Sequence, residues 1–397
     1  MKRSREWIAG AVLATAGMVF ALVMLEVGVR VLHLVPDRFW EPDPLLGARL
    51  TPGKSGWWSQ EEREFLVPIQ INQQGLRDVE HDYDKKPGVF RVLVLGDSFM
   101  EAMHVPLEDT FPRRLQAEIA KDRGDVEVIG AGVSGYGTAG AVLFFEREGV
   151  RYKPDLVVLA FYPGNDVRNN SPTLEDTLRP VYGEDGTLQK VEGAGSGAAV
   201  NEGWGGRSRA YQYLRKLVLT RQPALAELLS DVGLIRAEAI RATPERGGVP
   251  VAYGVYGEPL DAEWEDAWRR TEGLLARLKA DVEKAGAGFA IAVVTTRERI
   301  YPDTWDEILA AHPDMGARPW DLQSPERRLL AWCSSSGARC LALEDAFEEA
   351  RDGGSEALHF RHDGHWTPAG HAVAASAVKT FIEGQRLLPA KAEGAKP

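Results

Sequence analysis

Residues 92–102 have the sequence VLVLGDSFMEA, in which a run of aliphatic residues stops at Gly96 and is followed at once by Asp97 and Ser98. A short apolar run that ends at glycine is typical of a buried strand leading into a tight turn. The turn would present a serine hydroxyl beyond the carboxyl end of that strand. A Gly-Asp-Ser tripeptide also occurs by chance in ordinary turns, so its meaning depends on the rest of the chain.

Four further apolar runs follow the first, and helical patterns separate them. The five runs are residues 90–95, 126–132, 155–161, 289–296 and 339–344. Helical periodicity is clearest over residues 110–121 and 261–286. Strands that alternate with helices predict a parallel sheet covered on both faces, because parallel strands need crossover connections. In such a sheet the functional site lies beyond the carboxyl ends of the strands, where Ser98 is expected.

The N-terminus predicts a membrane anchor. Basic residues among the first five precede an uncharged, mostly apolar run of nineteen residues from Trp7 to Leu25, about the length that spans a bilayer core. The alternative is a cleaved signal peptide, processed at residues 14–16. That cleavage would leave an apolar core of only residues 8–13, shorter than signal peptides use. We therefore expect an uncleaved anchor, with its basic flank in the cytoplasm and the rest of the chain outside.

Changes in pattern along the chain predict its domain organisation. The parts are a basic flank and transmembrane helix at 1–32, a membrane-proximal segment at 33–87, an α/β domain at 88–384 and a loose tail at 385–397. The third and fourth strands are too far apart for one crossover, which indicates an insertion at about 168–260. A Gly/Ala/Ser tract at 193–208 is followed there by a mostly helical stretch at 209–242. We interpret this insertion as a lid or a substrate-binding element beside the site.

Composition narrows the class of protein. A net charge of −11 without a basic stripe argues against a nucleic-acid partner. Cys333 and Cys340 are the two cysteines, and no spacing of cysteines or histidines suggests zinc. They are close enough in sequence to form a disulfide outside the cytoplasm, a pairing that the sequence leaves open. With no phosphate-binding or dinucleotide-binding glycine motif present, we expect no metal and no cofactor.

Residues suited to nucleophilic catalysis follow other predicted strands. Serine catalysis needs a histidine to take the hydroxyl proton, an acid to orient that histidine, and donors for the oxyanion. After the second strand, Gly135 in GVSGYGT can offer its backbone N–H at close approach because it has no Cβ. After the third strand, Asn165 in FYPGNDV can donate a side-chain N–H. Asp363 and His365 precede the last predicted helix, whose start is marked by Thr-Pro.

These blocks, in this order, resemble those of the SGNH (GDSL-type) hydrolase superfamily, which is named for Ser, Gly, Asn and His. Gly96–Ser98 match the first block, Gly135 the second, Gly164–Asp166 the third, and Asp363 with His365 the last. The resemblance covers about residues 88–384 without the insertion. Its four blocks are specific together, although any one alone would not be.

The resemblance implies a fold and a set of roles. The fold is a flavodoxin-like three-layer α/β/α sandwich with a five-stranded parallel sheet. Three residues would form a catalytic triad of nucleophile, base and orienting acid: Ser98, His365 and Asp363. The oxyanion hole would consist of two backbone N–H groups and one side chain: Ser98, Gly135 and Asn165. Two residues would support the serine turn: Gly96 and Asp97.

The last block departs from the usual spacing of the superfamily. It is D-x-H-W here instead of D-x-x-H, which leaves His362 and His359 as alternatives for the base. His371 lies inside the last predicted helix, where a packing or capping role is the simpler interpretation. The D-x-H-W form resembles the membrane-anchored and periplasmic branch that includes alginate O-acetyltransferase-like proteins. That resemblance implies a single-pass protein of a bacterial inner or cytoplasmic membrane, with its catalytic domain facing the periplasm or the exterior.

Three functions remain open on the sequence. The first is a serine esterase that acts outside the cytoplasm on O-acyl, above all O-acetyl, esters of a small molecule or a polysaccharide. The second is an O-acetyltransferase that modifies a cell-surface polysaccharide, with a membrane acyl-carrier partner. The third is a catalytically silent, membrane-tethered binding protein. Three tryptophans would suit sugar stacking, although core packing is the commoner role: Trp57, Trp58 and Trp204.

Overall fold

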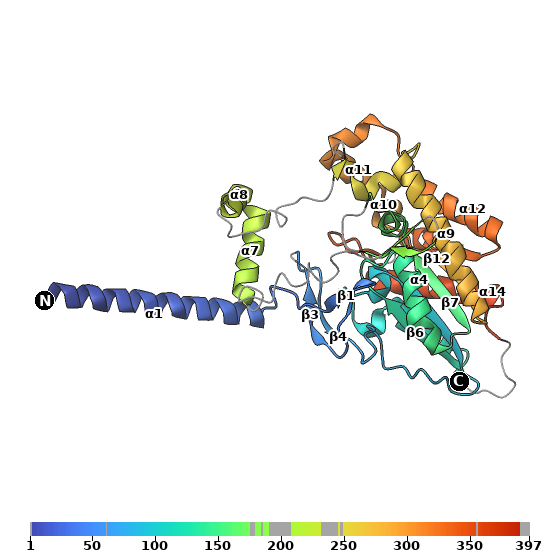
Figure 1. Ribbon diagram of the computed structural model, residues 1–397, viewed down its shortest axis with the longest axis horizontal. Coiled ribbons are helices and arrows are strands. Elements are labelled where there is room, and N and C mark those ends of the chain that lie inside the picture. Colours follow the sequence, from blue (N-terminus) through green and yellow to red (C-terminus); the bar gives the residue numbers. More distant parts are fainter. Residues whose placement is uncertain are drawn as a thin grey trace.

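The centre of the protein is a five-stranded parallel sheet with the order β13-β12-β7-β5-β6 (Figure 1). The computed structural model describes residues 2–60, 62–174, 179–183, 186–189, 208–231, 245–246, 249–354 and 356–389. The strands are β5 (Phe90–Gly96), β6 (Val126–Gly132), β7 (Leu156–Phe161), β12 (Gly288–Val293) and β13 (Arg339–Ala342). The five predicted strands and their parallel arrangement are confirmed. The fourth run ends as a strand at Val293, three residues before its predicted end.

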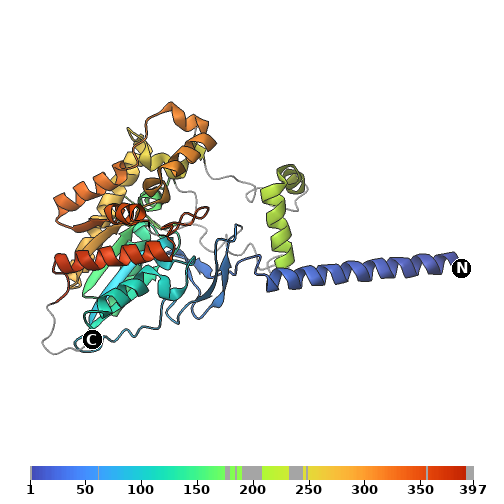
Figure 2. The same cartoon turned by 180° about the vertical axis from the view of Figure 1, so that it is seen from behind.

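Helices cover both faces of the sheet, so the predicted three-layer sandwich is confirmed (Figures 1 and 2). One face carries α3 (Phe111–Ala120), α13 (Glu344–Asp352) and α14 (Pro368–Gly384). The other carries α4 (Thr138–Arg147), α9 (Ala262–Lys284) and α12 (Ser324–Ser336). Successive side chains of a strand point to opposite faces. Accordingly Val92 and Val94 belong to the first core, and Leu93 and Leu95 to the second.

Short elements follow the carboxyl ends of the strands and shape the site. They are α2 (Ser98–Glu101), η1 (Leu107–Asp109), α5 (Pro163–Asp166), η3 (Arg168–Asn170), η6 (Val251–Tyr256), α10 (Arg297–Ile300), α11 (Pro302–Ala311) and η7 (Pro313–Ala317). Elsewhere lie η2 (Gly149–Tyr152) and two small hairpins, β8 (Val181–Tyr182) with β9 (Leu188–Gln189) and β10 (Glu245–Arg246) with β11 (Val249–Pro250). Most of the site is therefore built from turns and short helices at one edge of the sheet.

The segment between the N-terminal helix and the sheet forms two antiparallel pairs. The first pair is β1 (Trp40–Asp43) with β2 (Gly47–Leu50), and the second is β3 (Ser55–Ser59) with β4 (Leu66–Gln70). Their buried side chains Phe39, Leu50 and Ile69 belong to the same core as α4 and α9. The segment therefore packs onto the α/β domain instead of serving as a bare spacer.

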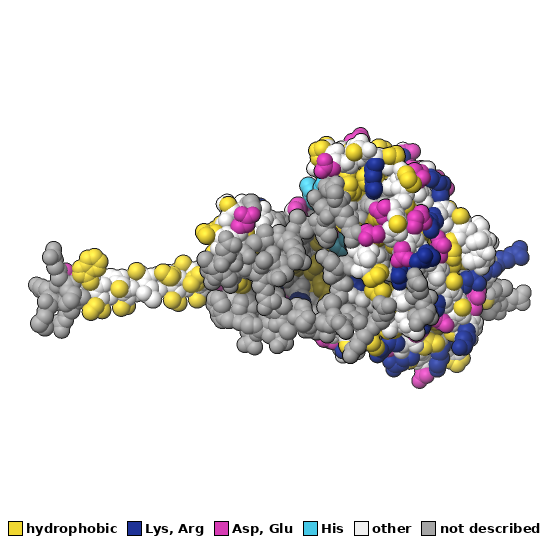
Figure 3. Space-filling view, turned by 45° about the horizontal axis from the view of Figure 1, so that its top comes forward, with side chains coloured by type: hydrophobic (Ala, Val, Ile, Leu, Met, Phe, Trp, Pro, Cys, Tyr) yellow, Lys and Arg dark blue, Asp and Glu magenta, His cyan; other side chains and the backbone are white. Residues whose placement is uncertain are grey.

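The N-terminal helix α1 (Lys2–Val31) extends away from the domain, with its apolar side chains uncovered (Figures 1 and 3). Within it, the 26 residues Glu6–Val31 are long and apolar enough to cross a membrane, by length and composition. Near its C-terminal end α1 contacts α7 (Arg209–Arg221), which is followed by α8 (Pro223–Asp231). The rest of the predicted helical stretch at 209–242 lies outside the described residues.

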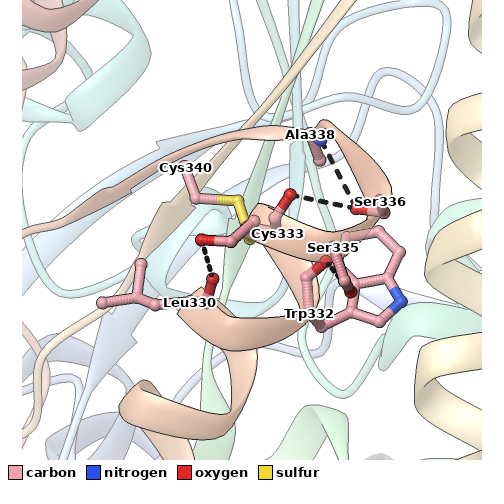
Figure 4. Close-up of a disulfide and its surroundings, with 8 residues drawn as sticks. Leu330, Trp332, Cys333, Ser335, Ser336, Ala338 and Cys340 are labelled. Atoms are coloured by element: carbon pink, nitrogen blue, oxygen red, sulfur yellow. Dashed lines mark hydrogen bonds between the residues drawn. A yellow bond between two sulfur atoms is a disulfide. The ribbon is translucent and has the colours of Figure 1, made fainter.

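The two cysteines form a disulfide, which decides the pairing that the sequence left open (Figure 4). Cys333 lies near the end of α12 and Cys340 in β13, with their Cα atoms 6.2 Å apart. Between them α12 ends at Gly337, whose φ of +69° is the left-handed conformation that favours glycine. The bond therefore joins β13, one of the two edge strands of the sheet, to the helix that precedes it.

Candidate active site

Ser98 is the first residue of α2, directly after β5. Asp97 caps this helix, since its side chain accepts the backbone N–H of Phe99 at 2.9 Å. Gly96 has no room for a side chain, because a Cβ there would lie 2.5 Å from the Met100 side chain. The close packing at Gly96 and the cap at Asp97 together fix the turn, and they present the Ser98 hydroxyl at the carboxyl edge of the sheet.

Asp363 and His365 lie in the loop before α14 and reach the same point. The Nε2 atom of His365 is 2.7 Å from the Ser98 Oγ, and its Nδ1 atom is 2.6 Å from an Asp363 carboxylate oxygen. Gly364 between them has a φ of +84°, which lets both side chains turn to one side. When Nδ1–H donates to Asp363, Nε2 is left to accept the Ser98 hydroxyl proton. The three residues thus form one hydrogen-bonded line.

The surroundings of Asp363 favour its ionised form. Burial alone would raise the pKa of this carboxyl, but the hydrogen bond from His365 and the nearby His104 and His365 rings hold the pKa below its ordinary value. A charged Asp363 is the form that can orient the His365 ring and stabilise an imidazolium.

Glu64 holds the loop that carries the acid and the histidine. Its carboxylate accepts the backbone N–H groups of Arg361 at 2.7 Å, His362 at 3.0 Å and Asp363 at 3.1 Å. Burial would raise the pKa of Glu64, yet these hydrogen bonds and one from Gln60 hold it below its usual value. Sequence reasoning missed this residue, since nothing near it in sequence points to a loop almost 300 positions away.

His104 is the second residue that sequence reasoning missed. Its ring stacks on the His365 ring with centroids 3.9 Å apart, and its Nε2 atom is 3.4 Å from an Asp363 oxygen. The edge of Phe65 packs against the same imidazole. Burial lowers the pKa of His104 well below its ordinary value. Its position six residues after Ser98, beyond the short helix α2, is the sequence signal that could have found it.

Asn165 lies in α5 and faces the same cavity as Ser98. One N–H of its side-chain amide donates to Asp97 at 2.8 Å. The amide nitrogen carries a second N–H, which is the one that could donate to a reacting oxygen. Asp97 therefore connects the serine turn to the asparagine, in addition to capping α2. Burial raises the pKa of Asp97 above its ordinary value.

Gly135 follows β6 on the other side of β5. Its φ is +82°, and the Arg179 guanidinium lies where a Cβ would be. Gly135 is not among the residues that line the cavity at Ser98. The hydroxyl of its neighbour Ser134 donates a hydrogen bond to the buried carboxylate of Glu101. The same carboxylate accepts the Trp40 indole N–H at 2.8 Å. Glu101 thus fastens the glycine turn and the membrane-proximal segment to the helix of Ser98.

The alternative histidines lie apart from the serine. His359 is buried, with its Nε2 atom 3.3 Å from the Thr295 carbonyl oxygen, and burial lowers its pKa to about 3. His371 is buried within α14 and accepts the Phe111 backbone N–H, and burial likewise lowers its pKa to about 3. His362 is exposed at the cavity wall. Only His365 among these four has a hydrogen bond to Ser98 within the described part of the chain.

A cavity of about 650 Å³ opens beside the serine. Its wall has charged and aromatic side chains from turns at the carboxyl edge, among them Arg168, Tyr253, Arg297 and His312. Tyr253 belongs to the last part of the predicted insertion, and Arg168 to its start. The helices α7 and α8 contribute none of the described residues of this wall. The helices α7 and α8 therefore lie elsewhere, where α7 contacts α1 and α8 contacts α7.

Within the described part of the chain, the candidate metal ligands are three residues at Ser98 already discussed: His104, Asp363 and His365. One atom each of His104, Asp363 and His365 lies within 4.8 Å of the others. Two imidazoles and a carboxylate would suit a transition metal. In this structure, however, Nε2 of His365 is hydrogen-bonded to the Ser98 hydroxyl, so this nitrogen already has a partner other than a metal. The arrangement is thus suited to moving the serine proton.

A family model matches the C-terminal part of the chain. Residues 258–396 match the SGNH hydrolase-like domain, acetyltransferase AlgX. The match contains Asp363 and His365, whereas Ser98, Gly135 and Asn165 precede it. None of the curated proteins matches this chain significantly.

Several solved structures are similar to the chain. TesA is 15% identical, with a TM-score of 0.38 over 75% of this chain and 99% of that one. A catalytic mutant of Axe2, an acetylxylan esterase from Geobacillus stearothermophilus, is 12% identical, with a TM-score of 0.36 over 77% and 100%. A GDSL-like lipase from Bacteroides thetaiotaomicron is 14% identical, with a TM-score of 0.36 over 77% and 93%.

Proposed function

We propose that the protein is a serine-dependent esterase that cleaves O-acyl esters, above all O-acetyl esters. The match of residues 258–396 to the SGNH hydrolase-like domain supports this proposal. The observation that carries this proposal is the hydrogen-bonded line from Ser98 through His365 to Asp363, with distances of 2.7 and 2.6 Å. A serine hydroxyl bonded to an imidazole that is itself oriented by a carboxylate is the arrangement that activates serine as a nucleophile.

The first half of the reaction forms an acyl-enzyme. The Ser98 Oγ attacks the ester carbonyl carbon while its proton passes to Nε2 of His365. Asp363 stabilises the resulting imidazolium through Nδ1–H. The negative charge on the former carbonyl oxygen is met by the Ser98 backbone N–H and the free N–H of Asn165, and the Gly135 N–H is the third proposed donor. Collapse of this intermediate expels the alcohol, which takes the proton from Nε2.

The second half releases the acyl group. A water molecule enters beside His365, gives one proton to Nε2 and attacks the acyl carbonyl carbon. The bond to the Ser98 Oγ then breaks, and the proton on Nε2 returns to that oxygen. The net change is one ester and one water converted to one alcohol and one carboxylic acid.

We further propose that α1 is an uncleaved anchor and that the domain lies outside the cytoplasm. The helix is apolar over residues 6–31, and its uncharged run follows the basic N-terminal flank. The Cys333–Cys340 disulfide supports an oxidising location for the domain.

A second candidate function is O-acetyl transfer to a polysaccharide, and the description of the matched family as an acetyltransferase favours it. In that reaction a sugar hydroxyl takes the place of water in the second half, so the same residues act. A membrane partner that carries the acyl group would then supply the donor.

The test uses the full chain in detergent and a short-chain p-nitrophenyl ester. Ser98→Ala should reduce hydrolysis by about 1,000-fold or more, because the nucleophile is lost. Ser376→Ala is the matched control, because this exposed serine of α14 is not among the residues that line the cavity, and its change should leave the rate nearly unaltered. Adding acetylated and unacetylated oligosaccharides distinguishes water from sugar as the acceptor, by the mass of the product. Equal background rates for wild type and Ser98→Ala, with no labelling by a fluorophosphonate, would instead support the silent binding protein.

A further inference from the structure

The helix α7, the first of the pair α7–α8 (residues 209–231), differs in charge from the rest of the protein. The sequence of α7 is RAYQYLRKLVLTR, with four basic residues and no acidic one. The whole chain, by contrast, has a net charge of −11. A basic helix on an acidic protein is suited to an anionic partner.

Large apolar side chains of this pair are exposed. Tyr211 and Leu214 of α7 are 37% and 45% exposed, and Leu225 and Leu228 of α8 are 41% and 58% exposed. In each helix the two residues are three positions apart, so they lie on one side of it. Besides the exposed residues of α1, few large apolar side chains of the described chain are as open to solvent. A helix with exposed apolar and basic residues together is typical of elements that lie in a membrane interface.

The pair is attached to α1 where the apolar run ends. The Glu26 carboxylate accepts hydrogen bonds from the Ser208 hydroxyl at 2.9 Å and from the backbone N–H groups of Arg209 at 3.0 Å and Ala210 at 2.8 Å. It therefore caps the N-terminus of α7, where the helix dipole favours negative charge. Glu26 is also the first charged residue after the uncharged run that starts at Trp7. The helix α7 thus starts at the depth where a spanning α1 would leave the hydrocarbon.

The direction of α7 fits the same surface. Both ribbon views show α7 standing crosswise to α1 at its C-terminal end, between α1 and the domain (Figures 1 and 2). If α1 follows the membrane normal, a crosswise helix at Glu26 runs along the membrane plane. An interfacial helix lies in that plane, with its apolar residues among the headgroups and upper acyl chains.

We propose that α7–α8 lies on the surface of the membrane that α1 spans, and that its occupant is an anionic lipid bilayer. Tyr211, Leu214, Leu225 and Leu228 enter the interface, and Arg215 of α7 binds lipid phosphates. This inference rests on the proposed anchor, and it adds a second contact with the bilayer. Two contacts, joined at Glu26, would fix the orientation of the domain relative to the membrane.

The test places a fluorescent thiol label on the full chain in vesicles of phosphatidylcholine and phosphatidylglycerol. Both native cysteines are in the disulfide, so an introduced cysteine provides the free thiol. Leu228→Cys is the test position. Val19→Cys, within α1, reports insertion of the anchor, and Lys284→Cys, at the exposed end of α9, is the soluble control. Hydrolysis of the p-nitrophenyl ester by each labelled chain shows that the domain is folded, independently of lipid contact.

The expected result is quenching of the labels at Leu228→Cys and Val19→Cys by a lipid-borne quencher, while the label at Lys284→Cys is quenched only by iodide in water. If the label in α1 is quenched and that at Leu228→Cys behaves like the soluble control, the proposal is wrong and the anchor stands. If neither is quenched, the anchor and this proposal both fail, whatever the esterase activity shows.

Charge reversal gives a second, independent readout. Arg215→Glu should reduce the lipid quenching at Leu228→Cys in vesicles that contain phosphatidylglycerol, because it weakens attraction to anionic headgroups. Lys284→Glu, at the exposed end of α9, is the matched reversal and should leave the quenching unchanged. Two results together would contradict the role of the basic residues. They are equal quenching at Leu228→Cys in both charge variants, and the same quenching in vesicles of phosphatidylcholine alone as in vesicles that contain phosphatidylglycerol.

Discussion

The two sides of the proposed catalytic line are held in place by different means. Ser98 follows a central strand of the sheet, and its turn is fixed by residues next to it in sequence, Gly96 and Asp97. His365 lies in a loop without regular structure, and that loop is held by Glu64 and His104 from distant parts of the chain. The serine side is thus specified locally, whereas the histidine side depends on long-range contacts.

This difference says where the site is most easily damaged. A strand with both faces buried keeps its position when one neighbouring side chain changes, because many other packing contacts still fix it. The loop of His365, in contrast, loses three backbone hydrogen bonds when the Glu64 carboxylate is removed. We therefore expect mutations around His365 to reduce activity at little cost in global stability. Mutations of the buried residues that support Ser98 should change stability more than activity.

The largest effect on the histidine side is expected for Asp363→Asn. The substitution keeps the shape of the side chain but removes the charge that fixes the His365 tautomer and stabilises its imidazolium. We expect kcat to fall by about 1,000- to 10,000-fold, with the melting temperature nearly unchanged. Ester hydrolysis and thermal unfolding of the same preparation check this. A fall of less than about tenfold would remove Asp363 from the proposed line.

The next effect is expected for Glu64→Ala, which removes the acceptor of three backbone N–H groups. Displacement of the loop should cost up to about 100-fold in kcat, because reacting groups tolerate little misplacement. Hydrogen exchange provides a direct readout, since the amides of residues 361–363 should lose protection while those of β5 keep it. Because the pKa of Glu64 is lowered in the folded protein, this protection should be present above the ordinary carboxyl pKa and fail as pH falls through the lowered one.

A smaller effect is expected for His104→Phe. Phenylalanine preserves a ring to stack on His365 but removes the nitrogen that lies 3.4 Å from Asp363. The loss of this polar contact should lower kcat by about fivefold, with KM unchanged. His104→Ala removes the stacked ring as well and should lower kcat further. Equal rates for wild type and His104→Phe, measured over the full pH range, would assign His104 a packing role alone.

The smallest effect on catalysis, and a measurable one on stability, is expected for Glu101→Gln on the serine side. Burial raises the pKa of Glu101 to about 7, so the folded protein keeps a proton that the unfolded chain releases near pH 4.5. The free energy of unfolding therefore falls as pH rises through that window. Glutamine carries no such proton, and between about pH 5 and pH 8 the variant should gain roughly 3 kcal/mol relative to wild type. Chemical denaturation at both pH values measures this difference in the free energy of unfolding. An equal change with pH in wild type and Glu101→Gln would contradict the prediction.

The same division explains what the sequence could predict. The strands, the capped start of α14 and the positions of Ser98 and Asn165 follow from local patterns, because a strand and its turn are encoded by neighbouring residues. The meeting of Ser98 with His365 was inferred from a resemblance and from strand order, not from any local signal. Glu64 and His104 could not be assigned, since their roles exist only after distant segments pack. The helical insertion was expected beside the site, and α7–α8 instead contacts α1.

The disulfide between α12 and β13 has a use beyond stability. The outermost strand of a sheet has an unpaired edge, and here that strand carries one of the two cysteines in the chain. A chain made without export would keep both thiols, whereas an exported chain would have none. Thiol alkylation of protein from whole cells, read as a mass shift, would therefore record which side of the membrane each molecule reached when it folded. The oxidation state of these two cysteines would thus report the compartment in which the chain folded, without an added tag.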